Sequence, residues 1–263
     1  MSKLTPIALK KQTPSPRYFG FWPGMQDSGD GRTQILDTSG QGRHMGVGVN
    51  GTYAAVTGTN SQWATIVGAA AGQDKSLATA GVFTWDLFAG QSLILQATMN
   101  AAPPGATAHI FNARGSGADV KGMAFTVDLN GKPVVFIRDT VATQSSNLPT
   151  NILADSTDHT FRVEINGTAK TMQIFIDGAP ISTHASPQAI TSTSGSTQSD
   201  DPVRWGGAGD FVAAASPTWV NGANLKLRHM HLLVMDSWPD NIAAIRAELL
   251  RNPHRPISAR LLP

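Results

Sequence analysis

Two runs of alternating apolar and polar residues, joined by an Asn-Gly step, dominate the middle of the chain. Residues 159–165 place Phe, Val and Ile on one side and Arg and Glu on the other, and residues 171–176 alternate similarly. A period of two is typical of a half-buried β-strand, because successive side chains point to opposite faces. Asn166-Gly167 between the runs is a strong hairpin signal. The pattern predicts an antiparallel hairpin, and Asp177-Gly178 predicts the turn after it.

A second pair of strand patterns predicts another hairpin earlier in the chain. Residues 123–128 and 133–138 flank a turn that contains Asn130-Gly131. Two consecutive hairpins favour an antiparallel sandwich over parallel βαβ units. Further strand patterns occupy residues 18–22, 63–67, 92–99, 108–114 and 224–236.

Residues 237–251 carry the helical pattern of the sequence. Ser237 is the expected N-cap, and Asp240 three residues later suits a capping box. Asn252-Pro253 ends the helix, because the residue before a proline avoids the helical region. The expected apolar face consists of Ile242, Ile245, Leu249 and Leu250.

Composition excludes several classes of protein. Charged residues make up 14% of the 263 residues, and the 41% hydrophobic content is enough to build a core. The net charge of +2 and the lack of a basic run argue against nucleic-acid binding. The absence of cysteine excludes disulfides, cysteine-ligated zinc and thiol catalysis. No apolar run has the length of a signal peptide or a transmembrane helix, so we expect neither, and no membrane insertion.

Proline-rich ends suggest a domain with two extensions. Residues 1–17 predict an extended N-terminal arm, residues 18–252 the folded domain, and residues 253–263 an extended C-terminal tail. The arm is either an unstructured terminus or a segment that docks on a neighbouring subunit.

Several of these features together resemble a known superfamily. Residues 37–44 read Asp-x-Ser-Gly-x-Gly-x-His, the hairpin at 159–176 ends in Ile-Asp-Gly, and residues 203–211 form a late strand with a glycine loop. This order, with a terminal helix, resembles the laminin-G-like jelly-roll domains of the concanavalin A-like lectin/glucanase superfamily over residues 18–252. The resemblance implies an all-β, antiparallel two-sheet jelly-roll sandwich with one short C-terminal helix.

The resemblance also suggests a metal site. Some relatives bind calcium, and Asp37 is the residue that matches such a site. The alternative is that Asp37 and His44 only hold their glycine-rich loop in shape. His229 and His231 lie two residues apart and would share a sheet face, either as metal ligands or as packed side chains.

The superfamily's glucanase chemistry is not expected here. Those enzymes place two carboxylates about 5 Å apart from one Glu-x-Asp-x-x-Glu strand. This chain lacks that motif, and its two glutamates, Glu164 and Glu248, are far apart in sequence. Residues 206–209 lack the Lys-Ser/Thr of a phosphate loop, and Ser116 lacks a nucleophile-elbow context. We therefore expect a protein that is not an enzyme, although a hydrolase built on aspartates stays open.

Sugar binding needs an exposed aromatic platform beside convergent polar groups. Trp205 and Trp219 flank the glycine loop that contains Asp210, so these three residues are the expected ligand site. The alternative is that both tryptophans pack in the core or at its rim.

The resemblance and the two extensions are similar to those of bacteriophage virion proteins. They imply a non-enzymatic structural protein, either a capsid decoration or a tail or fibre component, located in the virion after assembly in the host cytoplasm. Its expected partners are other virion proteins, further copies of itself and a glycan, with residues 186–201 as an outer loop. The alternative is a free carbohydrate-binding lectin, with or without calcium. No other cofactor is expected.

Overall fold

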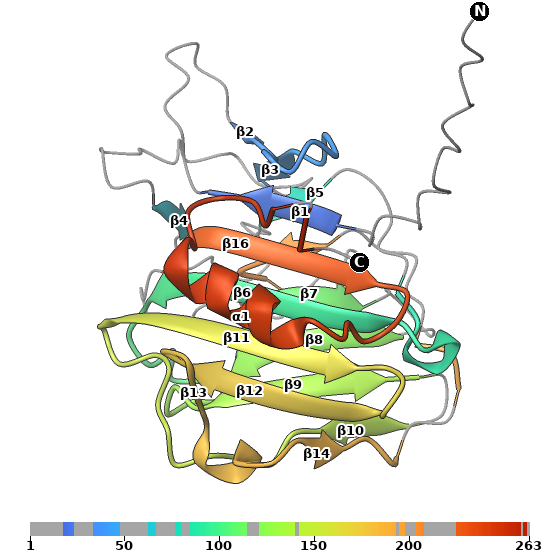
Figure 1. Ribbon diagram of the computed structural model, residues 1–263. Helices are drawn as coiled ribbons and strands as arrows, with labels where there is room; N and C mark the ends of the chain where they lie inside the picture. Colours follow the sequence, from blue (N-terminus) through green and yellow to red (C-terminus); the bar gives the residue numbers. More distant parts are fainter. Residues whose placement is uncertain are drawn as a thin grey trace, which may run out of the picture.

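The computed structural model describes residues 18–23, 34–47, 63–66, 77–79, 85–114, 121–139, 142–192, 195–197, 203–207, 225–258 and 260–261. Asp210, Trp219, the N-terminal arm and parts of residues 186–201 lie outside these ranges. The rest forms two antiparallel sheets and, within the described ranges, one α-helix (Figure 1). This confirms the predicted all-β sandwich with a single short helix.

Sheet A is built around three long central strands. Its order is β1 (Tyr18–Trp22), β16 (Leu225–Met235), β6 (Ser92–Asn100), β11 (Asp158–Asn166), β12 (Thr171–Ile176) and β13 (Ala179–Pro180). Two short strands join the edges of this path: β4 (Ala64–Ile66) pairs with β16, and β14 (Gln188–Ala189) pairs with β12. Strands far apart in sequence therefore lie side by side.

Sheet B forms the second layer. Its order is β10 (Thr143–Ser145), β9 (Pro133–Arg138), β8 (Gly122–Val127), β7 (Ala108–Arg114), β15 (Arg204–Trp205), β5 (Leu77–Thr79), β3 (Met45–Val47) and β2 (Gln34–Ile35). Strand β10 was not among the strand patterns of the sequence, because three residues are too few to show alternation. Two short 3₁₀ helices, η1 (Leu87–Ala89) and η2 (Ser182–His184), lie in connections.

Both predicted hairpins are present. Asn166 pairs with Thr171 where β11 meets β12, and Val127 pairs with Pro133 where β8 meets β9. In the second turn Gly131 has a φ of +81°, and a Cβ there would lie 2.3 Å from the carbonyl oxygen of Ala154. Only glycine meets both demands, which explains the Asn-Gly signal.

The main core lies between the two sheets. Phe161, Val163 and Ile165 of β11 point into it, as their alternation predicted, and Phe161 packs on Phe125 with ring centroids 4.8 Å apart. Trp22 and Trp205 are fully buried in the same cluster. Burial of this apolar surface is the main source of stability in such a fold.

A second apolar cluster lies on the other side of sheet A, under helix α1 (Ile242–Arg251), which crosses that face in Figure 1. It explains why β16 ends in a run that is apolar on both faces. The described part of the C-terminal tail contributes Ile257, which is 5% exposed, so this part packs against the domain. The members of the cluster are Phe21, Ile94, Leu233, Met235, Ile245, Leu249 and Ile257.

A bulge in β16 overturns the predicted alternation of that strand. The pairing with β6 shifts register between Arg228 and His231, and His229 has a φ of +52°. Leu227 points into the main core before the bulge, whereas Met230 does so after it. The bulge thus breaks the regular alternation on which the expected pairing of His229 and His231 rested, and within the described ranges neither ring belongs to a group of three His, Asp or Glu side chains that could hold a metal ion.

His231 instead belongs to the helix side of the sheet. Its ring stacks on Phe21 with centroids 4.2 Å apart, and Nε2 lies 2.7 Å from the carbonyl oxygen of Pro253. Burial lowers the pKa of His231 to about 3. The folded state therefore holds this ring neutral. Its contribution to the stability of the fold is complete above about pH 6.5 and is lost progressively as the pH falls, because the unfolded chain then binds the proton more tightly.

The helix begins later than the sequence predicted. Asn241 is its N-cap and makes no side-chain capping bond, so Ser237 and Asp240 do not form the expected capping box. Pro239 accounts for the delay, because the residue before a proline avoids helical dihedrals. Ile245 and Leu249 are buried as expected, but Leu250 is 47% exposed. No helix in the described ranges is long and apolar enough to span a membrane.

Candidate functional site

Glu164, the more buried of the two glutamates, lies where α1 covers sheet A. Its Oε1 accepts hydrogen bonds from Nε of Arg162 at 2.7 Å and from Nε of Arg246 at 2.9 Å. Arg162 and Glu164 are 3% and 2% exposed, although their alternation had placed them in solvent. Both guanidinium groups also lie over the ring of Phe175. The cluster ties the helix to the sheet.

The charges of this cluster are coupled. Burial lowers the pKa of Arg162, while the hydrogen bond to Glu164 raises the pKa of Arg246. Glycosidic hydrolysis would need a second carboxylate facing Glu164. The other glutamate, Glu248, is hydrogen-bonded to Asn252 on its own helix. The cluster is therefore a structural ion pair, not a pair of catalytic acids.

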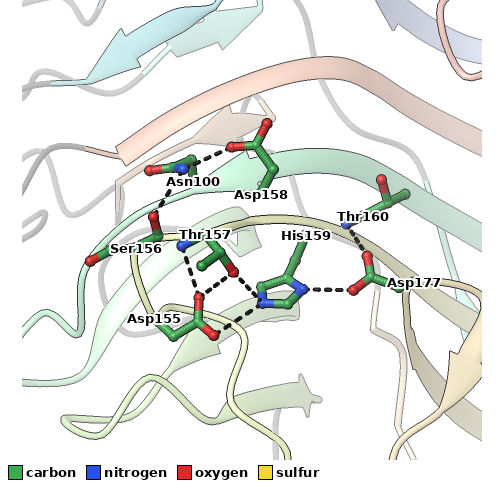
Figure 2. A network of polar contacts seen from close by, with 8 residues as sticks. All are labelled: Asn100, Asp155, Ser156, Thr157, Asp158, His159, Thr160 and Asp177. Carbon is green, nitrogen blue, oxygen red and sulfur yellow. Dashed lines mark hydrogen bonds and ion pairs between the residues drawn. The ribbon is translucent and has the colours of Figure 1, made fainter.

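A polar network lies at the start of β11 (Figure 2). Nδ1 of His159 lies 2.7 Å from Oδ2 of Asp177, and its Nε2 lies 3.3 Å from Oδ2 of Asp155. Asp177, in the predicted Ile-Asp-Gly turn, also accepts a hydrogen bond from the backbone N–H of Thr160 at 2.8 Å. The imidazole thus bridges the loop before β11 and the turn after β12.

The two carboxylates favour the charged form of the ring. Burial works against protonation of His159, but the hydrogen bonds that its ring makes to Asp177 and Asp155 outweigh burial and raise the pKa of the ring. Hydrogen bonds from Thr157 lower the pKa of Asp155 against a smaller effect of burial.

Asp177, His159 and Thr157 stand in the order of a carboxylate–imidazole–hydroxyl relay, and Oγ1 of Thr157 lies 3.0 Å from Nε2 of His159. The same hydroxyl lies 2.7 Å from Oδ1 of Asp155, which is the better acceptor for its proton. Both ring nitrogens of His159 therefore face carboxylates, and the contacts join the loop before β11 to the turn after β12.

The contacts of His159 with Asp177 and Asp155 predict that the stability of the fold depends on pH. Because the folded state binds the proton of His159 more tightly than the unfolded chain, its contribution is complete below about pH 6.5 and is lost as the pH rises through the folded pKa. Urea unfolding of wild type and His159→Gln on both sides of that pH should show the difference shrinking as the pH rises. In the control Asp177→Asn, NMR should show a lower pKa for His159. A stability difference that grows with pH would contradict the assignment.

The network continues onto the outer face of sheet A beyond α1. Nδ2 of Asn100 donates to Oδ1 of Asp158 at 2.8 Å, and Nη2 of Arg228 donates to Oδ2 of the same carboxylate at 3.2 Å. The guanidinium carbon of Arg228 lies 4.1 Å from the ring centroid of Trp63. Residues of β6, β11 and β16 thereby meet next to an aromatic ring that immediately precedes β4.

The structure describes only Trp205 of the expected ligand site. Trp205 is fully buried, with its ring edge-to-face against Trp22 at 6.3 Å and Phe111 at 5.1 Å. It therefore cannot offer a ring face to a sugar, and the core-packing alternative holds for it. Asp210 and Trp219 lie outside the described residues.

Asp37 organises its loop. Its Oδ1 accepts backbone N–H groups of Phe21 at 3.0 Å and Ser39 at 2.9 Å, and its Oδ2 accepts that of Arg43 at 3.0 Å. The backbone N–H of Asp37 donates to Nδ1 of His44 at 3.0 Å. This is the loop-shaping role that the sequence offered as the alternative to calcium. Within the described ranges, no three His, Asp or Glu side chains lie close enough together to hold a metal ion.

Sequence reasoning did not select Trp63, Asn100, Asp158 or Arg228. Alternation does place Asp158 on the same face as Arg162, which was a usable signal. The missing information was the order β4–β16–β6–β11, which joins residues from four distant parts of the chain.

No protein-family model matches the chain, and no curated protein matches it in sequence. Solved structures do share its fold. The binding domain of botulinum neurotoxin DC, in complex with rat synaptotagmin II, has a TM-score of 0.58 at 11% identity, covering 88% of this chain and 51% of that one. A structure of botulinum neurotoxin type C, a toxin whose cell entry is described as dependent on two ganglioside molecules, has a TM-score of 0.58 at 12% identity. The match covers 91% of this chain and 52% of that one.

The binding domain of Paraclostridial Mosquitocidal Protein 1 has a TM-score of 0.59 at 11% identity, again covering 91% and 52%. The chain thus spans about half the length of these neighbours. Identities this low show a common two-sheet β-sandwich fold and no more. The assignment to the laminin-G-like jelly rolls stays a prediction.

Proposed function

We propose that this chain is a non-enzymatic binding module, a lectin-like sandwich that recognises a glycan or protein partner. The observation that supports this most is the fold shared with toxin binding domains over about nine-tenths of the chain. One of those structures is a complex with rat synaptotagmin II, and another is described by the dependence of cell entry on interaction with two ganglioside molecules. A rigid sandwich that presents a face or a rim to a partner suits this role.

The roles of the acidic side chains support the non-enzymatic part of the proposal. Glu164 is held between two arginines, and Asp37 and Asp177 accept backbone N–H groups that hold loops. Each of these three carboxylates accepts hydrogen bonds that hold neighbouring segments of the fold together.

The finer proposal is a structural component of a bacteriophage virion, either a capsid decoration or a tail or fibre protein. The proline-bounded residues 1–17 are suited to pack against a neighbouring copy or another virion protein. The low content of charged residues, 14%, is compatible with a chain that buries much of its surface in an assembly. A free lectin is the alternative, and it needs no self-association.

Binding and assembly measurements separate these proposals. The purified chain is expected to bind glycans on an array without releasing sugar from polysaccharide, and to form a defined oligomer in light scattering. Antibody-labelled micrographs of phage particles should place it on the capsid or the tail. A strict monomer that binds glycans, with no label on particles, would favour the free lectin. Release of sugar would contradict the non-enzymatic role.

A further inference from the structure

The outer face of sheet A is only partly covered by α1. Under the helix lie Arg162, Glu164 and Gln96, whose Nε2 donates to the carbonyl oxygen of Leu249. Further along the same strands the face is polar and accessible. We call this part the open face and define it by Trp63, Asn100, Asp158, Lys226 and Arg228. Their side chains share one side of the sheet, because the alternating residues Leu225, Leu227, Met99 and Phe161 all point into the core.

Pairing registers fix the size of the open face. Lys226 pairs with Asn100, Asn100 pairs with Asp158, and Arg228 pairs with Thr98 next to that row. With strands about 4.8 Å apart and residues about 3.4 Å apart along each strand, the polar groups cover about 10 by 7 Å. Protein–protein interfaces bury about 800 Å² on each partner. The open face is therefore the size of a small ligand or a sugar unit.

The hydrogen-bonding groups on this face are mixed in kind. Nδ2 of Asn100 donates to Asp158 and to the carbonyl oxygen of Ser156, which leaves Oδ1 of Asn100 as an acceptor, and the carboxylate of Asp158 has further lone pairs. Arg228 uses one Nη2 hydrogen on Asp158 and keeps other donors, and Lys226 is exposed. A phosphate or sulfate needs donors only and would be repelled by Asp158. A hydroxyl group both donates and accepts, so paired hydroxyls fit this set.

Trp63 adds the apolar component. Its ring is partly exposed, and it is held in place by the guanidinium of Arg228. A sugar ring combines hydroxyl groups at its rim with an apolar C–H face, and binding sites for such ligands pair an aromatic surface with a few placed polar groups.

We propose that the open face is a saccharide-binding site, with the C–H face of one sugar unit against Trp63 and its hydroxyl groups on Asp158, Asn100 and Arg228. This inference rests on the proposed binding function and names its place and ligand class. The face is shallow, so a single site binds in the millimolar to micromolar range, and several copies in an oligomer raise the apparent affinity by about a hundredfold or more.

Stability does not explain this arrangement. The Arg228–Asp158 pair has side chains 29% and 50% exposed, and exposed ion pairs contribute about 0 to 1 kcal/mol to stability. Substitutions in the open face are therefore expected to leave the fold intact, which makes binding measurements on them interpretable.

The test uses the full chain on an array of neutral, sialylated and uronic-acid oligosaccharides. Trp63→Ala, Arg228→Met and Asp158→Asn should each weaken the wild-type signals by about tenfold or more. Trp238→Ala and Arg138→Met are the matched controls, because Trp238 is partly buried beyond the far end of β16 and Arg138 is exposed on sheet B. The controls should bind within about twofold of wild type. Circular dichroism and the urea midpoint check that every variant is folded.

The outcomes are distinguishable. If wild type binds glycans and the folded open-face variants bind equally well, the site is wrong while the binding function stands. If wild type binds no oligosaccharide but assembles on particles, the saccharide inference is overturned and the assembly role stands. If wild type neither binds nor assembles, the proposed function itself fails. Loss confined to acidic glycans in Arg228→Met would support the site and narrow its ligand to carboxylate-bearing sugars.

Discussion

Glu164→Gln should lower the free energy of unfolding by about 3 to 5 kcal/mol, which is the usual cost of removing one partner from a buried ion pair. Glu164 is 2% exposed and accepts hydrogen bonds from both Arg162 and Arg246. Arg246 has a side chain 34% exposed and can turn towards water, but Arg162 would remain buried without a counter-charge. Urea unfolding followed by tryptophan fluorescence measures the change.

The chain provides its own control for this substitution. Glu248 is the only other glutamate and lies on α1, where it is half-buried and bonded to Asn252. Glu248→Gln should change the free energy of unfolding by no more than about 0.5 kcal/mol. Adding Arg162→Met to Glu164→Gln should recover part of the loss, because it removes the isolated charge. A loss below about 1 kcal/mol for Glu164→Gln would show that Arg162 is well solvated.

Trp205→Ala is expected to cost about 3 to 5 kcal/mol of stability, the range for removing a large aromatic side chain from a core. Trp205 is fully buried against Trp22 and Phe111, and it sits at the pairing of β15 with β7. Trp63→Ala should cost far less, because Trp63 is partly exposed outside the core cluster. Thermal and urea unfolding of the two variants under identical conditions measure the contrast.

Binding data give the complementary result. Trp205→Phe keeps an aromatic ring in the core and should retain wild-type glycan signals, whereas Trp63→Ala should lose them. A Trp205 variant that remains fully stable but loses binding would reverse the roles assigned to the two tryptophans.

The local sequence pattern predicted the burial of side chains correctly where one face of a strand packs on the core. The alternation in β11 predicted which of its side chains are buried between the sheets, and Asn-Gly steps predicted both hairpin turns. The same alternation placed Arg162 and Glu164 in water. It failed because α1 covers the outer face of sheet A, and a helix more than 70 positions later leaves no mark in the local pattern of β11.

The candidate site could not be predicted from the local sequence pattern for a related reason. Trp205 belongs to a two-residue strand, which is too short to show a period, and its burial depends on neighbours from β5 and β7. Trp63, Asn100, Asp158 and Arg228 meet only because the order of sheet A brings their strands together. The burial of a residue and its neighbours from other strands are tertiary properties. The sequence alone therefore could not show which tryptophans lie in the core and which lie at the surface.

The bulge at His229 makes β16 two half-strands of opposite phase. Upstream of it, the outward set is Lys226 and Arg228; downstream, the outward set is His231, Leu233 and Met235, beneath the helix. If the same residues alternated regularly without the bulge, the downstream half would turn to the opposite face, sending Leu232 and Val234 to the helix and His231 into the main core. The bulge thus separates a polar stretch of the outer surface from an apolar stretch within one continuous strand, so that either stretch can change in sequence without changing the other.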